Sequence, residues 1–361
     1  MRQVDSDTPR TLLSVIIPAY NVEAYIGESL ESALRQPRIN EIELIVVNDG
    51  STDSTLDRIL AIKGTEQGHN IRVIHQENRG VSAARNAAIA HARSPYIGFL
   101  DADDVWSPNF SDVIMPLLEA GTADIIEFNV GIIDSKGRII ERMELIARGS
   151  VGPRAGGTEA LMEFARVWQV FPGARVYRRE LWEGIEFPAG RVYEDRSAIP
   201  LVYTRARTLY RLADELYYYR RRAGSITQKA TPHTVMSLAI CAEEALANCD
   251  AGVNAAYWMA MFHKNFAHAC IQTSRVDTGA FPESMRIVEA TAARYRTFTE
   301  QRPDELPRLR FHMRIFAERR VFQAKRVIKR VFGLELRPPP VAPRPVEPAE
   351  LPGHPPPAAS E

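Results

Sequence analysis

The chain has 361 residues, 45% of them hydrophobic, and its 45 Lys and Arg residues balance 45 Asp and Glu residues. This length predicts more than one structural unit with a sizeable core, and the charge balance argues against a surface built for polyanions. The amino terminus is polar through Arg10, and no apolar run reaches the roughly 18 residues that span a bilayer. We therefore expect a soluble, cytoplasmic protein without a signal peptide, whose three cysteines are reduced thiols.

Strands and helices alternate regularly in the first part of the chain. Apolar runs predict strands at 12–18, 42–47, 71–75 and 96–100. Helical periodicity, capping residues or alanine-rich composition predicts helices at 22–35, 53–62 and 80–92. This alternation predicts an α/β fold, with a mostly parallel sheet covered by helices on both faces.

The pattern is less regular after Trp106. It predicts helices at 110–120, 158–168 and 196–205, strands at 123–130, 174–177 and 216–222, and a hairpin-type turn at 134–137. From about 232 to 330 long helical segments dominate, so we expect a separate helical region. Beyond Arg337 the chain is rich in proline and poor in large apolar residues, which predicts a disordered tail.

Three carboxylates, Asp101, Asp103 and Asp104, directly follow the predicted strand 96–100. Open α/β sheets bind ligands at the carboxyl ends of their strands. Three anions buried together would cost several kcal/mol unless a cation neutralised them, which favours a divalent ion shared with phosphate oxygens. The alternative is a solvated turn, because Asp is common in turns and Pro108 follows.

Two further strand ends should lie beside this one, because parallel strands place their carboxyl ends at one edge. The three strand ends and the segment that opens the predicted helix 80–92 read Val15-Ile-Ile-Pro-Ala-Tyr-Asn21, Val47-Asn-Asp-Gly-Ser-Thr-Asp53, Phe99-Leu-Asp-Ala-Asp-Asp104 and Arg79-Gly-Val-Ser-Ala-Ala-Arg-Asn86. In order and spacing they resemble the family 2 glycosyltransferases of the GT-A fold, especially bacterial enzymes that build surface polysaccharides. The resemblance covers about residues 11–110 and continues more weakly to about 228.

The resemblance implies a GT-A (Rossmann-like) mixed, mostly parallel sheet with helices on both faces, followed by a C-terminal helical region. The expected units are a flexible N-terminus 1–10, a nucleotide-sugar-binding half 11–130, an acceptor-binding half 131–230, a helical region 231–336 and a disordered tail 337–361.

The resemblance also assigns residues to the donor. Pro18, Tyr20 and Asn21 would border the nucleotide, and Asp49 would hydrogen-bond the base. Asp101, Ala102 and Asp103 would form an Asp-x-Asp motif that meets the ribose and the diphosphate, with Asp101 and Asp103 as ligands of Mg or Mn. Arg85 would help to bind the phosphates, unless it is a surface arginine on its helix.

Glu194 and Asp195 resemble the Glu-Asp pair that opens a helix in the acceptor half of this family. By that resemblance Asp195 is the general base, and a carboxylate within hydrogen-bond reach can accept the proton of an attacking sugar hydroxyl. Adjacent helical residues point in different directions, so Glu194 would orient the loop or cap the helix. The alternative is that both acids merely favour a helix N-terminus.

Arg220 and Arg222 resemble a basic segment of the family that could close over the diphosphate with bidentate bonds. A solvated strand end is the alternative. The stretch 171–177 departs from the family pattern, which often has Trp and Lys there, so acceptor contacts in it are open.

Together these features predict a metal-dependent, inverting glycosyltransferase that uses a nucleotide-diphospho-sugar, most simply a UDP-sugar, and a glycan or lipid-linked acceptor. One alternative is a nucleotidyltransferase, although the first strand lacks a Gly-rich phosphate loop. Another is a non-catalytic sugar-nucleotide-binding protein of a polysaccharide assembly complex.

Basic and apolar residues are interleaved from 311 to 332. This pattern predicts a helix that contacts an anionic membrane peripherally, at the inner face of the cell membrane, or a packing helix with a solvated basic face. Nucleic acid is not expected as a partner, because no recognition motif accompanies the basic stretch.

Overall fold

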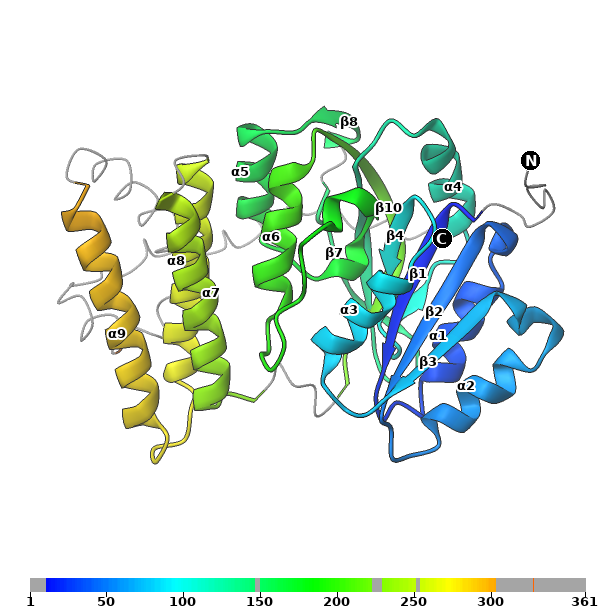
Figure 1. Cartoon of the computed structure of the whole chain (residues 1–361), viewed down its shortest axis with the longest axis horizontal. Helices are drawn as coiled ribbons and strands as arrows, with labels where there is room; N and C mark the ends of the chain where they lie inside the picture. The colour runs from blue at the N-terminus through cyan, green and yellow to red at the C-terminus, as the bar shows by residue number, and fades with distance from the viewer. Residues whose placement is uncertain (1–10, 147–149, 223–228, 251–253, 303–326, 328–361) are drawn as a thin grey trace, which may run out of the picture.

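The computed structural model describes residues 11–146, 150–222, 229–250, 254–302 and 327. Figure 1 shows a central sheet flanked by helices, with the long helices of the C-terminal region stacked at one end. The predicted flexible N-terminus, the Pro-rich tail and, apart from Val327, the predicted membrane helix at 311–332 lie outside the described residues. Those three expectations remain predictions.

One mixed sheet runs through residues 13–220, in the order β3-β2-β1-β4-β9-β6-β10-β5, with β7 beside β6 and β8 beside β10. Its strands are β1 (Leu13–Ala19), β2 (Ile42–Asp49), β3 (Ile71–Gln76), β4 (Tyr96–Phe99), β5 (Val105–Trp106), β6 (Ile125–Ile133), β7 (Ile139–Met143), β8 (Gly152–Ala155), β9 (Arg175–Arg178) and β10 (Thr208–Arg220).

The longest ladders of this sheet are parallel: β1 with β2, β2 with β3, and β6 with β10. β4 is parallel to β1, while β9 lies antiparallel between β4 and β6. The carboxyl ends of β1, β2, β4, β6 and β10 therefore share one edge of the sheet. This confirms the convergence of strand ends expected from the sequence.

Helices cover both faces of the sheet, as predicted. Their bounds are α1 (Ile26–Leu34), α2 (Thr55–Lys63), α3 (Val81–His91), α4 (Phe110–Ala120), α5 (Thr158–Val167), α6 (Asp195–Arg205), α7 (Pro232–Asp250), α8 (Ala255–Thr273) and α9 (Phe281–Glu300). Because side chains alternate along a strand, Ile16 of β1 joins the core under α3, α5 and α6. Its neighbours Val15 and Ile17 join the core under α1 and α4.

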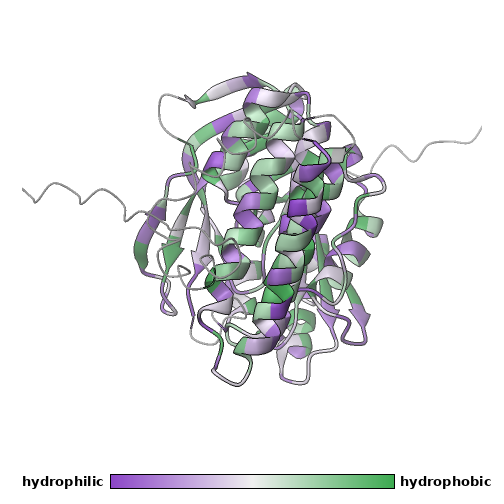
Figure 2. Cartoon of the chain, turned by 90° about the vertical axis from the view of Figure 1, so that its left-hand side faces the viewer, coloured by the Kyte–Doolittle hydropathy of each residue, from purple (hydrophilic) through white to green (hydrophobic). Residues whose placement is uncertain are grey.

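The helical region predicted after residue 232 is present as α7, α8 and α9. Its core is continuous with the core under α5 and α6, so these helices pack against the part of the chain that contains the sheet (Figure 1). Within it the rings of Phe262 and Tyr295 stack with centroids 4.7 Å apart. Figure 2 views this end of the molecule and shows apolar and polar residues alternating along the outer helices.

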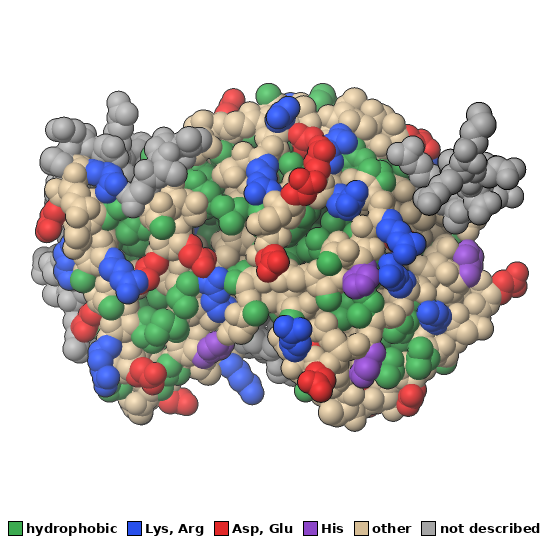
Figure 3. Space-filling model, viewed as in Figure 1, with side chains coloured by type: hydrophobic (Ala, Val, Ile, Leu, Met, Phe, Trp, Pro, Cys, Tyr) green, Lys and Arg blue, Asp and Glu red, His purple; other side chains and the backbone are tan. Residues whose placement is uncertain are grey.

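Two further observations bear on the predicted partners. No helix in the described part of the chain is long and apolar enough to cross a membrane. Acidic and basic side chains are interspersed over the face shown in Figure 3, as the balanced composition implies. The division of the sheet into donor and acceptor halves stays a prediction, and β6 spans the boundary placed at 130.

Candidate active site

The loops that leave β1 and β2 are joined by hydrogen bonds at the carboxyl edge of the sheet. Asn21, which has a left-handed φ of 50°, accepts a hydrogen bond from the Thr52 amide over 2.8 Å. The Asn21 amide donates to Ser51 Oγ over 3.2 Å. Tyr20 is 46% exposed at this rim, and Pro18 is partly buried in β1. These residues lie at the carboxyl edge of the sheet, and their contacts with a nucleotide remain predictions.

Asp49 ends β2 and is buried. Its carboxylate accepts hydrogen bonds from the amides of Arg79 and Gly80, over 2.9 and 2.7 Å, and from Gln76 Nε2 over 2.7 Å. The adjacent Gly50 has a φ of 69°, and a Cβ there would lie 2.6 Å from the Asn78 nitrogen. Asp49 thus holds the loop that leads into α3, while its predicted bond to a base stays a prediction.

Asp104 fastens the end of β4 to β10. Its buried carboxylate accepts hydrogen bonds from Tyr217 Oη over 2.6 Å and from the Arg220 amide over 2.7 Å. Tyr217 Oη also accepts a bond from the Asp101 amide over 3.2 Å. Burial raises the pKa of Asp104 well above its usual range, and the charges of Asp103 and Asp101 raise it further. Its role in the structure is to fix the loop.

The two predicted arginines both reach this loop. Arg222 Nε donates to Asp103 Oδ2 over 2.7 Å. Arg220 is buried, and it donates to the Asp103 carbonyl over 2.8 Å and to Glu28 Oε2 over 2.7 Å. Burial raises the pKa of Asp103, with Asp101 raising it further and Arg222 lowering it. Arg220 therefore supports the loop, and Arg222 is the more accessible of the two cations.

Arg85 connects Asp101, at the carboxyl edge of the sheet, with the start of α6. It is buried, and its Nη2 donates to Asp101 Oδ1 over 2.8 Å while its Nη1 donates to Glu194 Oε1 over 2.5 Å. Its guanidinium lies 5.3 Å from the ring centroid of Phe187. The sequence placed Arg85 at the phosphates, whereas the structure places it between two carboxylates. Binding of phosphate by Arg85 remains a prediction.

Asp195 is the first residue of α6, with Glu194 as its N-cap residue. Asp195 Oδ1 is buried and has no hydrogen-bond partner among the residues that the structure describes. Burial raises the pKa of Asp195 to about 6, and the neighbouring Glu194 charge raises it while Arg196 and Arg85 lower it. A carboxylate with a raised pKa and a free oxygen can accept a proton near neutral pH.

Asp101 and Asp103 are the candidate metal ligands. Their side chains are 28% and 21% exposed, and the charge of one raises the pKa of the other, so they lie close together. No group of three His, Cys, Asp or Glu side chains suited to a metal occurs in the described ranges. Two part-exposed carboxylates nevertheless fit Mg or Mn, since such ions take further ligands from water and substrate phosphates.

The stretch 171–177, which departs from the family pattern, is part of the core. Arg175 is buried, donates to the Gln169 carbonyl over 2.7 Å and lies 3.5 Å from Glu127. A Cβ at Gly173 would lie 2.6 Å from the Tyr217 ring. This stretch supports the sheet beside the site.

Comparison with known proteins identifies the family. The family described as "Glycosyl transferase family 2" matches residues 14–185. Glycosyltransferase GlyG of Streptococcus pneumoniae serotype 4 is 31% identical over 225 residues, which are 60% of this chain and 72% of the relative. The chain belongs to glycosyl transferase family 2. It is therefore a glycosyltransferase, as the motifs predicted.

Other comparisons agree with this assignment. The uncharacterized glycosyltransferase EpsJ of Bacillus subtilis is 35% identical over 223 residues, 60% of this chain and 63% of the relative, so the chain spans less than two thirds of that protein. The crystal structure of S. aureus TarS 1-349 has a TM-score of 0.65 at 20% identity, over 91% of this chain and 93% of TarS. A second TarS structure, in complex with UDP-GlcNAc, gives 0.63 at 21% identity over 78% and 81%. The fold is GT-A, as expected.

Some residues of the site gave no recognisable signal in the sequence. Tyr217 is the first of three consecutive tyrosines, and this pattern indicates only a strand. Glu28 is one of several polar residues on α1, and nothing local links it to Arg220. Arg85 did carry a signal, because it adjoins Ala84 and precedes Ala88 by three positions on the buried face of α3.

Proposed function

We propose that this glycosyltransferase moves a sugar from a nucleotide-diphospho-sugar, specifically a UDP-sugar, to a hydroxyl of a glycan or lipid-linked acceptor in surface polysaccharide synthesis. The observation that carries the proposal is the pairing of two sites across Arg85. On one side lie the carboxylates of Asp101 and Asp103 at the sheet edge, and on the other lies Asp195, whose Oδ1 has no hydrogen-bond partner among the described residues.

The donor side would bind the nucleotide-diphosphate. The rim formed by Pro18, Tyr20 and Asn21 would border the base and ribose. Asp101 and Asp103 would hold a divalent cation, which stabilises negative charge on a departing diphosphate. Arg222, already beside Asp103, adds positive charge where the diphosphate would lie.

The acceptor side would supply the base. The Asp195 carboxylate would take the proton from an acceptor hydroxyl while the oxygen of that hydroxyl bonds to the anomeric carbon. The bond from the anomeric carbon to the diphosphate oxygen breaks in the same displacement, and the nucleoside diphosphate leaves. A single displacement inverts the anomeric configuration, and the family resemblance supports this outcome.

Two lines support UDP as the nucleotide. The TarS structure with this fold is a complex with UDP-GlcNAc. The four segments at the sheet edge resemble the donor motifs of the family. Membership of the family favours this reaction over nucleotidyl transfer, and the retained carboxylates favour catalysis over a purely structural role.

A donor screen tests the proposal. Hydrolysis of UDP-, GDP- and dTDP-sugars would be measured with and without Mn²⁺, for the wild type and for Asp103→Ala. We expect hydrolysis of a UDP-sugar that requires the metal and falls in the variant. Equal rates with and without Mn²⁺, or a clear preference for GDP- or dTDP-sugars, would contradict the metal or the nucleotide assignment respectively.

A further inference from the structure

The residue before the Glu194–Asp195 pair has an unusual backbone conformation. Tyr193 has a φ of 62°, in the left-handed region that bulky residues rarely adopt. Such a conformation persists only where the surrounding structure fixes it. Because Tyr193 directly precedes Glu194, the N-cap residue of α6, its backbone affects how the chain enters the helix that carries Asp195.

Helix α8 holds this segment from one side. Gln272 Nε2 donates to Tyr193 Oη over 3.3 Å, and the rings of His268 and Tyr193 have centroids 5.3 Å apart. Asn265 Oδ1 accepts a bond from Arg196 Nη1 over 3.3 Å. The three α8 residues are spaced by three and four positions, so one face of the helix makes all these contacts.

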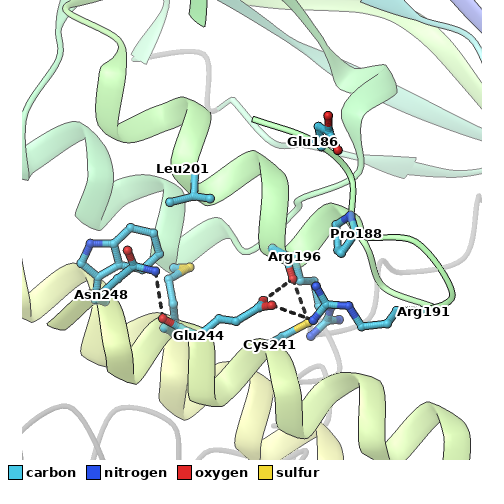
Figure 4. A pocket seen from close by; sticks show the side chains of 12 residues that line it. Glu186, Pro188, Arg191, Arg196, Leu201, Cys241, Glu244 and Asn248 are labelled. Carbon is cyan, nitrogen blue, oxygen red and sulfur yellow. Dashed lines mark hydrogen bonds and ion pairs between the residues drawn. The ribbon is translucent and has the colours of Figure 1, made fainter. Parts of the chain in front are cut away.

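Helix α7 holds the segment from another side. Its Glu244 accepts hydrogen bonds from Arg191 Nη1 over 2.7 Å and from Ser197 Oγ over 2.6 Å. Cys241 Sγ, one turn earlier, donates to the Tyr193 carbonyl over 3.7 Å. Figure 4 shows Glu244 directed toward Arg191 beside a cavity of about 270 Å³, which lies between α6, the preceding loop and α7 and α8.

We propose that the C-terminal helical region completes the catalytic site by positioning Asp195. Glu244 and Gln272 are the positioning residues, and they act on Asp195 through residues 191–197. The proposal rests on the proposed function, in which Asp195 is the base. Small misplacements of a catalytic group lower the rate of the chemical step strongly, even when substrate binding is intact.

The chain offers a matched pair of variants on α7. Glu244 contacts the segment that carries Asp195, whereas its neighbour Glu243 pairs with Arg294 and accepts a hydrogen bond from Thr291, both on α9. We expect Glu244→Gln to lower kcat of sugar transfer by about tenfold with an unchanged Kd for UDP. Glu243→Gln should leave kcat at the wild-type value even if both variants lower the melting temperature.

A double-mutant cycle supplies a second test on α8. Gln272→Leu and Tyr193→Phe each remove the same hydrogen bond, so each should lower kcat, and the double variant should lose no more than the larger single effect. This cycle keeps the proposal testable if Glu244→Gln fails to fold. Independent, multiplying losses would overturn the proposed action of Gln272 through Tyr193.

Asp195→Asn is measured in parallel to separate the two proposals. Wild-type kcat in Glu244→Gln, or equal losses in Glu243→Gln and Glu244→Gln, with an inactive Asp195→Asn, would overturn the positioning role alone. Retained transfer in Asp195→Asn would overturn the proposed base, and the positioning role with it.

Discussion

Two groups of carboxylates differ in how their charge is balanced: those at the carboxyl edge of the sheet, Asp101, Asp103 and Asp104, and Asp195 at the start of α6. Asp101 is paired with Arg85, Asp103 with Arg222, and Asp104 accepts bonds from Tyr217 and the Arg220 amide. The charges of Arg196 and Arg85 lower the pKa of Asp195, yet its Oδ1 has no hydrogen-bond partner in the described part of the chain.

This difference suits the two regions to different chemistry. The paired carboxylates of Asp101, Asp103 and Asp104 are held in place by their partners at the edge of the sheet. A buried carboxylate without a full set of partners has a raised pKa, so it takes up a proton more readily. Arg85 touches both regions, because it bonds Asp101 directly and reaches α6 through Glu194.

Removing the uncompensated carboxylate should have the largest effect. Asp195→Asn keeps the shape of the side chain but cannot accept the proton, so transfer should fall by roughly 10²–10⁴-fold. Affinity for UDP, measured by calorimetry, should stay unchanged because Asp195 does not contact the donor in the proposed mechanism.

Glu194→Gln is the matched control for this variant. Its amide oxygen can still accept a bond from Arg85, so we expect a loss of transfer below about tenfold. If Asp195→Asn keeps more than about a tenth of the wild-type rate, the base lies elsewhere and Glu194 becomes the candidate.

Replacing Arg85, the cation that contacts both regions, should lower the free energy of unfolding. Arg85→Met leaves Asp101 and Glu194 without their buried partner, and the free energy of unfolding should fall by about 3 kcal/mol. Urea denaturation at pH 7 measures it. Arg79→Met is the control, because Arg79 is exposed and such changes stay within about 0.5 kcal/mol. Equal effects in both variants would show that Arg85 is no internal bridge.

The same comparison predicts that the charged Asp195 carboxylate lowers the free energy of unfolding. Because the pKa of Asp195 is about 6 in the fold and near 3.8 in the unfolded chain, the folded state binds the extra proton between these values. Wild-type stability from this group therefore falls as pH rises from 4 to 6 and stays low above 6.

Asp195→Asn should remove this penalty. Its free energy of unfolding should exceed that of the wild type by up to about 3 kcal/mol at pH 7.5 and match it near pH 3.5. Denaturation curves at the two pH values measure the gain. A variant that is less stable than the wild type at pH 7.5 would mean that Asp195 is a structural cap.

A further effect is expected at Asp103, at the carboxyl edge of the sheet. Asp103→Ala should weaken binding of UDP with Mn²⁺ at least tenfold, which is about 1.4 kcal/mol. Asp112→Ala, at an exposed position on α4, should bind as the wild type does. Calorimetry that shows the same, metal-independent affinity in Asp103→Ala would remove Asp103 from the proposed metal site.

The sequence was most informative where local pattern and position in the sheet coincide. The apolar strands predicted at 12–18, 42–47 and 96–100 are present as β1, β2 and β4, and the parallel ladders bring their ends to one edge. They depend on short-range periodicity and on the general geometry of parallel sheets. The helix predicted at 196–205 is α6, which begins at Asp195, and the family resemblance implied that Glu194 and Asp195 open a helix.

Long-range pairing could not be read in the same way. The antiparallel insertion of β9 and the first half of β10 were missed, because the choice of partner strand leaves no local pattern. Tyr193 makes hydrogen bonds with Cys241 and Gln272, which lie far along the chain. The sequence therefore named candidate site residues, but it did not indicate the residues that contact and hold them.

The place of β10 in the sheet has a consequence for synthesis of the protein. Asp104 is bound by the amide of Arg220, 116 residues later in the chain. At about 5–20 residues per second, a ribosome needs roughly 6–23 s to supply that residue after it has made Asp104. During this interval the nascent donor loop lacks its anchor on β10. A fragment that ends before β10 contains every donor-side carboxylate, yet none of the β10 groups that hold them in place.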